Sequence, residues 1–254
     1  MQAWMFDMEI LTNSALLPLI LGICAALLVG LAKTGVPGIG IMAVPLMAMV
    51  FPAKISVGAL LPLLIAADLF AVAFYRRHTE WPRLLELFPC VIAGIIAGSI
   101  VLYLMNADYF KPFLGTLVLA LLALELIRGR LGWAHIPHQR WFVVLSGSLA
   151  GFATTVGNVA GPVMNIYLIA KGLQKRQFMG TLAWYFFIVN CIKVPIYAGF
   201  GLINGETLRF DAWMIPAVAV GALLGRWVLG RISQKWFKTV VLGLAALAAL
   251  RLLW

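Results

Sequence analysis

The residues best suited to chemistry are a few ionisable and amide side chains set within long apolar stretches. Lys33 and Lys193 are cations in such stretches, Asp68 is the one acid deep inside its segment, and Asn190 precedes Lys193 by one helical turn. Charged groups are costly inside a membrane, so they mark functional sites by default. Two cations suit the binding of an anion, and a carboxylate suits the binding of a coupling proton. The structural alternatives are a snorkelling lysine and an ion pair between Asp68 and one of the lysines.

Two interruptions rich in glycine and proline lie close to these residues in the sequence. The first runs from Lys33 to Pro45, and the second, residues 154–162, follows about 120 residues later. Glycine adopts backbone conformations that other residues resist, and proline lacks an N–H donor, so we expect the helix to break at both places. Irregular backbone at membrane depth must be buried in protein or line a polar cavity. Two broken segments at matching places indicate the binding site of a transporter.

Neutral donors would complete such a site. The N-terminus of a helix presents N–H groups and a positive dipole end to an anion, and Gly38–Gly40 and Gly161 are expected to begin the helices after the two breaks. The predicted binding residues are Lys33, Thr34, Gly35, Gly38, Gly40, Thr154, Thr155, Asn158, Gly161, Asn165, Asn190 and Lys193, with Asp68 as the predicted ion-coupling residue. The threonine hydroxyls have an alternative role, bonding back to their own helices. We predict no metal site and no cofactor, because no cysteines or histidines have a familiar ligand spacing.

Membrane-spanning helices are the elements that must position these residues. The chain has 254 residues, of which 63% are hydrophobic and 11% are charged, and its mean hydropathy is +1.02. Several segments of about 18 residues or more carry few charges, which is long enough to span a bilayer. We therefore expect an all-α integral membrane protein with one transmembrane domain, residues 1–254. The net charge of +10 reflects lysine and arginine in short loops, so the expected partner is the lipid bilayer and not nucleic acid.

Ten helical segments are predicted, of which the second and the seventh are too short to span a bilayer comfortably. Their expected ranges are 13–32, 38–51, 55–76, 82–105, 109–128, 140–155, 160–171, 176–199, 209–229 and 234–253. Each short segment is expected to fold back against the segment before it, as a broken or re-entrant pair.

The two halves of the chain repeat the same short motifs, at residues about 10–130 and about 138–254. The stretch that begins at Gly30 and ends in Lys-Thr corresponds to the one that begins at Gly151 and ends in Thr-Thr. Three positions of the fourth segment correspond to three of the ninth, namely Pro89, Gly94 and Gly98 to Pro216, Gly221 and Gly225. The glycine spacing predicts close helix packing rather than ligand binding. Five segments per repeat is an odd number, so we expect the two repeats to be inverted in the membrane.

The basic residues predict the orientation of the chain. They gather at alternate connections, in a set formed by Arg76, Arg77, Arg83, Arg128, Arg130, Arg140, Lys171, Lys175, Arg176, Arg226, Arg231, Lys235 and Lys238. Lysine and arginine accumulate in cytoplasmic loops, so these connections are expected to face the cytoplasm. Both termini are then expected on the outer, periplasmic or extracellular side.

One known family combines these features. Residues 30–45 resemble the first-repeat motif of the TauE/SafE family of sulfite exporter-like transporters, and residues 151–162 are similar to its second-repeat motif. The resemblance covers nearly the whole chain. It implies a permease of the bacterial inner membrane, built from two repeats, that moves small sulfur-containing anions such as sulfite, thiosulfate or organosulfonates. Many members have extra glycines where this chain has Lys33 and Thr34, a difference that would alter anion selectivity.

The expected function is transport of a small sulfur-containing oxyanion by alternating access at the junction of the two broken segments. An anion-selective channel would use the same residues, and saturable flux driven by a second ion would distinguish a transporter from it. A membrane enzyme is the more distant alternative, because no hydrolase motif appears and the three histidines fall in expected loops. The sequence leaves open the exact substrate, the direction of transport and the coupling ion, and it is compatible with a homo-oligomer.

Overall fold

The structure of the chain is a computed structural model that describes residues 13–131, 140–228 and 250. The helices are α1 (Asn13–Thr34), α2 (Ala43–Val50), α3 (Ala53–Tyr75), α4 (Trp81–Leu104), α5 (Ala107–Leu131), α6 (Arg140–Gly157), α7 (Gly161–Ala170), α8 (Lys175–Gly199) and α9 (Gly205–Val228), with 3-10 helices η1 (Ile39–Met42) and η2 (Arg76–His78). The described residues form no strand, which confirms the predicted all-α class. The predicted segment 234–253 lies outside the described residues, except for residue 250.

Six of these helices are long and apolar enough to cross a membrane: α1, α3, α4, α5, α8 and α9. The stretch Ile39–Val50 and helix α7 are apolar but shorter, as the sequence predicts for the second and seventh segments. Large apolar side chains also cover the outer surface, where Leu85, Leu104 and Trp213 are 67, 70 and 79% exposed. So much exposed apolar surface suits a hydrocarbon environment and would favour association in water. The chain is therefore a multi-pass membrane protein.

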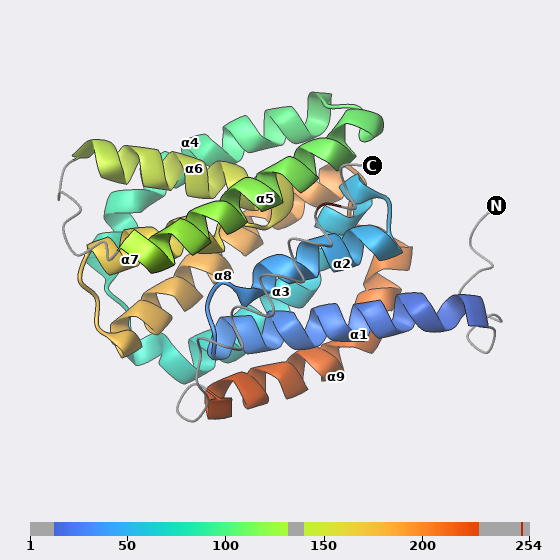
Figure 1. Cartoon of the computed structure of the whole chain (residues 1–254), viewed down its shortest axis with the longest axis horizontal. Coiled ribbons are helices and arrows are strands. Elements are labelled where there is room, and N and C mark those ends of the chain that lie inside the picture. The colour runs from blue at the N-terminus through green and yellow to red at the C-terminus, as the bar shows by residue number, and fades with distance from the viewer. Residues whose placement is uncertain (1–12, 132–139, 229–249, 251–254) are drawn as a thin grey trace.

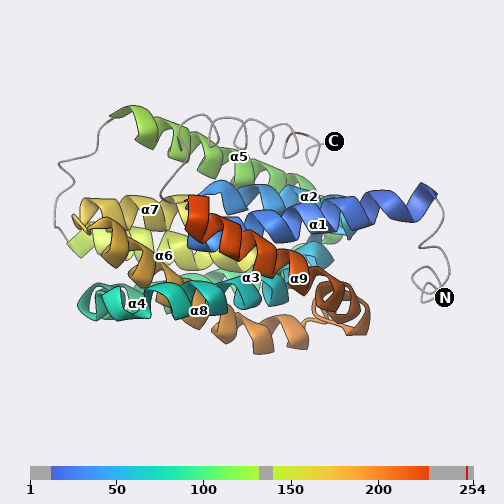
Figure 2. The same cartoon turned by 90° about the horizontal axis from the view of Figure 1, so that it is seen from below.

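Two pairs of helices dominate the packing, α1 with α9 and α6 with α4. Each pair joins the first half of the chain to the second. Figure 1 shows α1 and α6 running in opposite directions along the long axis of the molecule. In Figure 2 α5 lies at one face of the bundle, and α4 and α8 lie at the opposite face.

Glycine makes both helix pairs possible. A Cβ atom on Gly30 would lie 2.2 Å from the carbonyl oxygen of Val218 in α9, and one on Gly151 would lie 2.1 Å from that of Val91 in α4. The same holds for further glycines in or beside the two pairs. A Cβ atom on any of them would lie within 2.9 Å of an atom of the facing helix or of the residues next to it: Gly35, Gly94, Gly98, Gly221 and Gly225. The predicted packing role of the glycines in the fourth and ninth segments is confirmed.

Alanine at Gly30 is expected to destabilise the protein, because its methyl group would meet backbone atoms that cannot rotate away. Overpacking of this kind typically costs about 1–3 kcal/mol. The matched control is Gly199→Ala, since a Cβ at Gly199 meets no atom within 4 Å. Thermal unfolding of the two purified variants in detergent measures the difference. Equal melting temperatures for wild type and Gly30→Ala would contradict the packing of α1 on α9.

A residue in the left-handed backbone region accompanies each break. Gly38, with a φ of 99°, precedes η1, and Asn158, with a φ of 57°, follows α6. Asn158 completes an αL capping motif, in which its N–H donates to the carbonyl oxygen of Thr154 at 2.9 Å, and the N–H of Val159 donates to that of Ala153 at 3.2 Å. Helix α1 continues to Thr34, two residues beyond the predicted end of that segment, so Lys33 lies in a helical turn.

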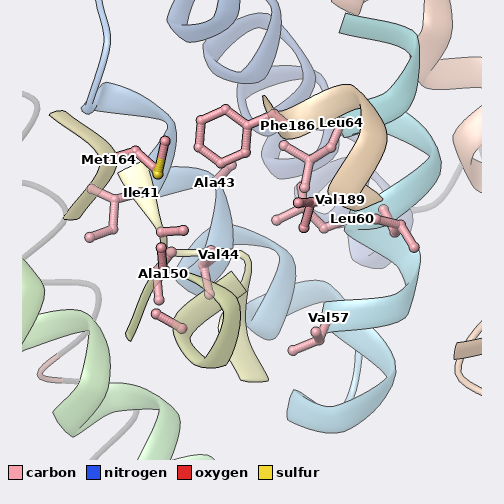
Figure 3. Close-up of a cluster of buried hydrophobic side chains, with 14 of the residues drawn as sticks. Ile41, Ala43, Val44, Val57, Leu60, Leu64, Ala150, Met164, Phe186 and Val189 are labelled. Atoms are coloured by element: carbon pink, nitrogen blue, oxygen red, sulfur yellow. The ribbon is translucent and has the colours of Figure 1, made fainter. Parts of the chain in front are cut away.

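The apolar core lies where the short helices of both halves meet the long ones. Figure 3 shows side chains from α2, α3, α6, α7 and α8 in one cluster, with Ile41 of η1, Met164 of α7 and Phe186 of α8 among them. This packing brings the two breaks together. A Cβ on Gly161, the first residue of α7, would lie 4.0 Å from the Cα atom of Gly38.

Candidate functional site

A cavity of about 50 Å³ lies between the two breaks, lined by residues of α1, α3, α6, α7 and α8 and of the connections that follow α1 and α6. A water-sized group needs roughly 10–15 Å³ of such space, so the cavity has room for about four such groups. A small oxyanion is of similar size. Eight of the predicted binding residues line this cavity: Lys33, Gly38, Gly40, Thr154, Asn158, Gly161, Asn165 and Asn190.

Lys33 is the cation on the cavity wall, and it belongs to an ion pair. Its Nζ atom lies 2.8 Å from Oδ1 of Asp68 on α3 and 3.5 Å from the ring centroid of Phe186 on α8. The Nδ2 atom of Asn190 donates a hydrogen bond of 2.6 Å to the other oxygen of Asp68. Asp68 is fully buried. The structure thus holds the ion pair between Asp68 and Lys33 that the sequence left as one alternative.

Lys193 lies behind the cavity wall and is fully buried. Its Nζ atom donates to the carbonyl and hydroxyl oxygens of Thr154, both at 3.0 Å, and to Oδ1 of Asn158 at 2.6 Å. The Nδ2 atom of Asn158 in turn donates to the carbonyl oxygen of Val57 at 2.9 Å. Lys193 therefore positions two residues that line the cavity, and its own hydrogen bonds go to neutral oxygens.

The two lysines and Asp68 leave one positive charge without a partner when all three are ionised. Within the described residues no carboxylate forms an ion pair with Lys193, whereas Asp68 is already paired with Lys33. An uncompensated charge is expensive in a low-dielectric interior, and an anion in the adjoining cavity would compensate it. The first turn of α7, which begins at Gly161, adds N–H groups and the positive end of a helix dipole.

Asn165 adds a further polar group to the cavity wall. Its side chain is buried, and its Oδ1 atom has no hydrogen-bond partner among the described residues. A buried amide normally has partners, so this unpaired acceptor oxygen next to a cavity indicates a place for a ligand group that can donate a hydrogen bond.

Three predicted binding residues lie away from the cavity, at the helix pairs. The hydroxyl of Thr34 lies 2.6 Å from the carbonyl oxygen of Ala222 in α9, and that of Thr155 donates to the carbonyl of Gly151 at 2.8 Å. A Cβ on Gly35 would collide with the backbone of α9. For both threonines the structure shows the back-bonding that the sequence left as the alternative, because the hydroxyl of Thr34 also lies 3.1 Å from the carbonyl oxygen of Gly30. These residues pack the ends of the broken helices against their neighbours.

Sequence reasoning missed two tyrosines that hold the ends of the broken helices. The hydroxyl of Tyr75, at the end of α3, donates to the carbonyl oxygen of Thr34 at 2.7 Å. The hydroxyl of Tyr197, near the end of α8, donates to the carbonyl oxygen of Thr155 at 2.6 Å. Aligning Gly30 with Gly151 places Tyr75 one residue away from Tyr197, and this near match was the signal that could have found them.

Comparison with known protein families shows which family the chain belongs to. The family model described as sulfite exporter TauE/SafE matches residues 20–252. The matched range contains both breaks and every residue that lines the cavity. No curated protein and no solved structure matches the chain significantly. Because the match spans nearly the whole chain, the protein belongs to the TauE/SafE family of sulfite exporters, whose members are membrane transporters.

Proposed function

We propose that this protein carries a small sulfur-containing oxyanion across the membrane and binds it in the cavity between the two breaks. The observation that carries the proposal is the convergence of Lys33, Asn158, Asn165 and the start of α7 on that cavity. These groups supply one cation, two amides and helix N–H donors, which suit an anion with several acceptor oxygens. Membership of the sulfite exporter family supports sulfite, thiosulfate or an organosulfonate as the cargo.

Alternating access would come from two inverted repeats, residues about 10–130 and about 138–254. Three observations support this proposal. The pairs α1 with α9 and α6 with α4 use glycines at corresponding positions, the two tyrosines cap corresponding carbonyls, and α1 and α6 run in opposite directions. A rocking motion of one helix pair against the other would then expose the cavity to each side in turn.

Asp68 is the proposed coupling residue, because it and the anion compete for the same ammonium group. The carboxylate holds Nζ of Lys33 at 2.8 Å. A proton on Asp68 removes that attraction and leaves Lys33 available to the anion on the cavity wall. The proton and the anion would therefore bind together, so that a proton gradient drives movement of the anion.

Counterflow in proteoliposomes tests the transport proposal. Vesicles loaded with unlabelled thiosulfate are expected to accumulate external radiolabelled thiosulfate transiently, because a carrier exchanges a loaded site between its two faces. Uptake should also saturate with thiosulfate concentration. Empty vesicles that carry purified protein of native stability provide the control. Conductance without counterflow or saturation would identify a channel instead.

The basic connections are expected to face the cytoplasm of a bacterium whose inner membrane holds the protein. In a variant without the three native cysteines, Glu206→Cys should react with a membrane-impermeant thiol reagent added to intact cells. Gln174→Cys, at the start of α8, should react only after the membrane is broken. Labelling of Gln174→Cys alone in intact cells would reverse the orientation.

A further inference from the structure

A second cavity, of about 460 Å³, lies at the end of the bundle where α3 and α9 end and α8 begins. Its lining residues are Phe74, Tyr75, His78, Lys175, Arg176, Met179 and Arg226. Four of them are basic and none is acidic. The side chains of Arg176 and Arg226 are exposed, so a ligand can reach them.

Local packing brings these basic residues together. A Cβ on Gly180 would lie 2.7 Å from the carbonyl oxygen of Tyr75, so the glycine lets the chain around η2 lie directly against α8. The N–H of Glu80 donates to the hydroxyl of Thr181 on α8 at 3.0 Å, which holds the connection after η2. The guanidinium of Arg226 lies over the ring of Phe74, 4.6 Å from its centroid. The wall of the cavity is therefore built from three separate parts of the chain.

The neighbouring acids are engaged elsewhere. Glu80 accepts a hydrogen bond of 2.6 Å from the side chain of Gln177, and Glu86 lies 3.2 Å from Nζ of Lys171. Residues 229–254, which follow α9 in the chain, contain no aspartate or glutamate. In addition, Nδ1 of His78 is buried and has no hydrogen-bond partner among the described residues. The cavity thus combines positive charge with a buried polar atom that still lacks a partner.

We propose that this second cavity binds a phosphate group, independently of the central cavity. The planar guanidinium of arginine can donate two hydrogen bonds to two oxygens of such a group. Basic cavities between membrane helices on the cytoplasmic side also bind lipid headgroups. The positive-inside rule explains an excess of cations at this end. It does not explain their convergence on one cavity with a buried histidine nitrogen that lacks a partner in the described part of the chain. A volume of about 460 Å³ exceeds the need of a bare oxyanion and suits one carried on a larger molecule.

Two sources carry this chemistry, the headgroup of an anionic phospholipid and free phosphate. Either occupant would touch Tyr75, whose hydroxyl donates to the carbonyl of Thr34 at the end of α1. Because Thr34 directly follows Lys33, the occupant would lie close to the helix turn that supplies the cation of the central cavity.

The test compares two double variants of the purified, delipidated protein. Arg176→Gln with Arg226→Gln removes two cations from the cavity, and Lys111→Gln with Arg209→Gln removes two exposed cations near the starts of α5 and α9. Equilibrium titrations use inorganic phosphate, dihexanoyl phosphatidylglycerol and, as the zwitterionic control, dihexanoyl phosphatidylcholine. Each basic contact to an anionic headgroup contributes roughly a fivefold factor, so the arginine pair is expected to weaken binding about 25-fold.

Saturable binding of phosphate that depends on the arginine pair supports a soluble oxyanion as the occupant. Saturable binding of phosphatidylglycerol alone, with the same dependence, supports a lipid. The proposal is overturned if neither probe binds the wild-type protein, or if the control pair weakens binding as much as the arginine pair does. It is also overturned if Lys33→Met abolishes the binding of the probe, because the central cavity would then be its site. None of these outcomes alters the counterflow test, so the two proposals fail separately.

Discussion

Methionine in place of Lys33 is expected to weaken thiosulfate binding at least tenfold and to destabilise the protein at the same time. The ammonium group lines the central cavity and forms the ion pair with Asp68. A hydrogen bond from a charged group typically contributes about 1.5–3 kcal/mol, which corresponds to roughly a ten- to hundredfold loss of affinity. Removal of one partner of a buried ion pair costs about 3–5 kcal/mol, because the other charge is left unpaired.

A double variant separates these two effects. Lys33→Met combined with Asp68→Asn removes both charges, so we expect thermal stability to recover while thiosulfate binding stays weakened. Lys111→Met serves as the control, because it removes an exposed lysine outside the cavity and should bind as wild type does. Calorimetric titration and thermal unfolding of the same preparations give both quantities. Unchanged affinity in a folded Lys33→Met protein would leave the amides and helix N–H groups as the whole anion site.

Asparagine in place of Asp68 is expected to make anion binding independent of pH and to end uptake driven by a pH gradient. In the wild type, protons favour the neutral carboxyl and so release Lys33, and thiosulfate binding should therefore tighten as the pH falls. Asp68→Asn keeps the shape of the side chain and an acceptor for the hydrogen bond from Asn190, but it cannot titrate. Thiosulfate is the suitable probe, because its own charge stays constant near neutral pH. Counterflow should persist in the variant, since exchange needs no net movement of protons.

Two other outcomes would remove Asp68 from the coupling mechanism. A stable Asp68→Asn protein with full uptake driven by the pH gradient would place the coupling on the substrate's own protonation or on another ion. A parallel loss of stability, binding and counterflow would show that the ion pair with Lys33 is structural. Proteoliposome uptake with and without the gradient, together with thermal unfolding, distinguishes these cases.

Most of the fold could be predicted, because hydropathy indicates where the helices lie and glycine and proline indicate where they break. The nine predicted segments within the described residues correspond to observed helices, and the two short ones appear where glycine and proline interrupt the apolar runs. Helix α1 ends two residues later than the sequence predicts, because Lys33 and Thr34 belong to the helix and not to the interruption. The side chain of Thr34 is satisfied within the α1–α9 contact, which supports the two further helical residues. The inverted arrangement of the repeats stays a prediction.

The candidate site was predictable in composition but not in geometry. Polar residues in apolar stretches identified Lys33, Asp68 and Asn190, which the structure brings together. The side of the helix on which a residue lies depends on which helix packs against it, so sequence alone could not separate Thr154, on the cavity wall, from Thr155, which faces away from it. Residue type alone did not distinguish the aromatic residues that contact the site, because they resemble many others in an apolar chain.

The claim that the central cavity binds a sulfur oxyanion is tested most directly by titrating sulfite and thiosulfate into the purified protein and its Asn165→Asp variant. Asn165 lines the cavity and is buried, so the substitution adds a negative charge at the site with almost no change of shape. Asn106→Asp adds the same charge at an exposed position and serves as the control. We predict saturable binding to one site per chain in the wild type and in Asn106→Asp, and none in Asn165→Asp. Equal binding by all three proteins, or no binding by a stable wild-type protein, would contradict the proposed site.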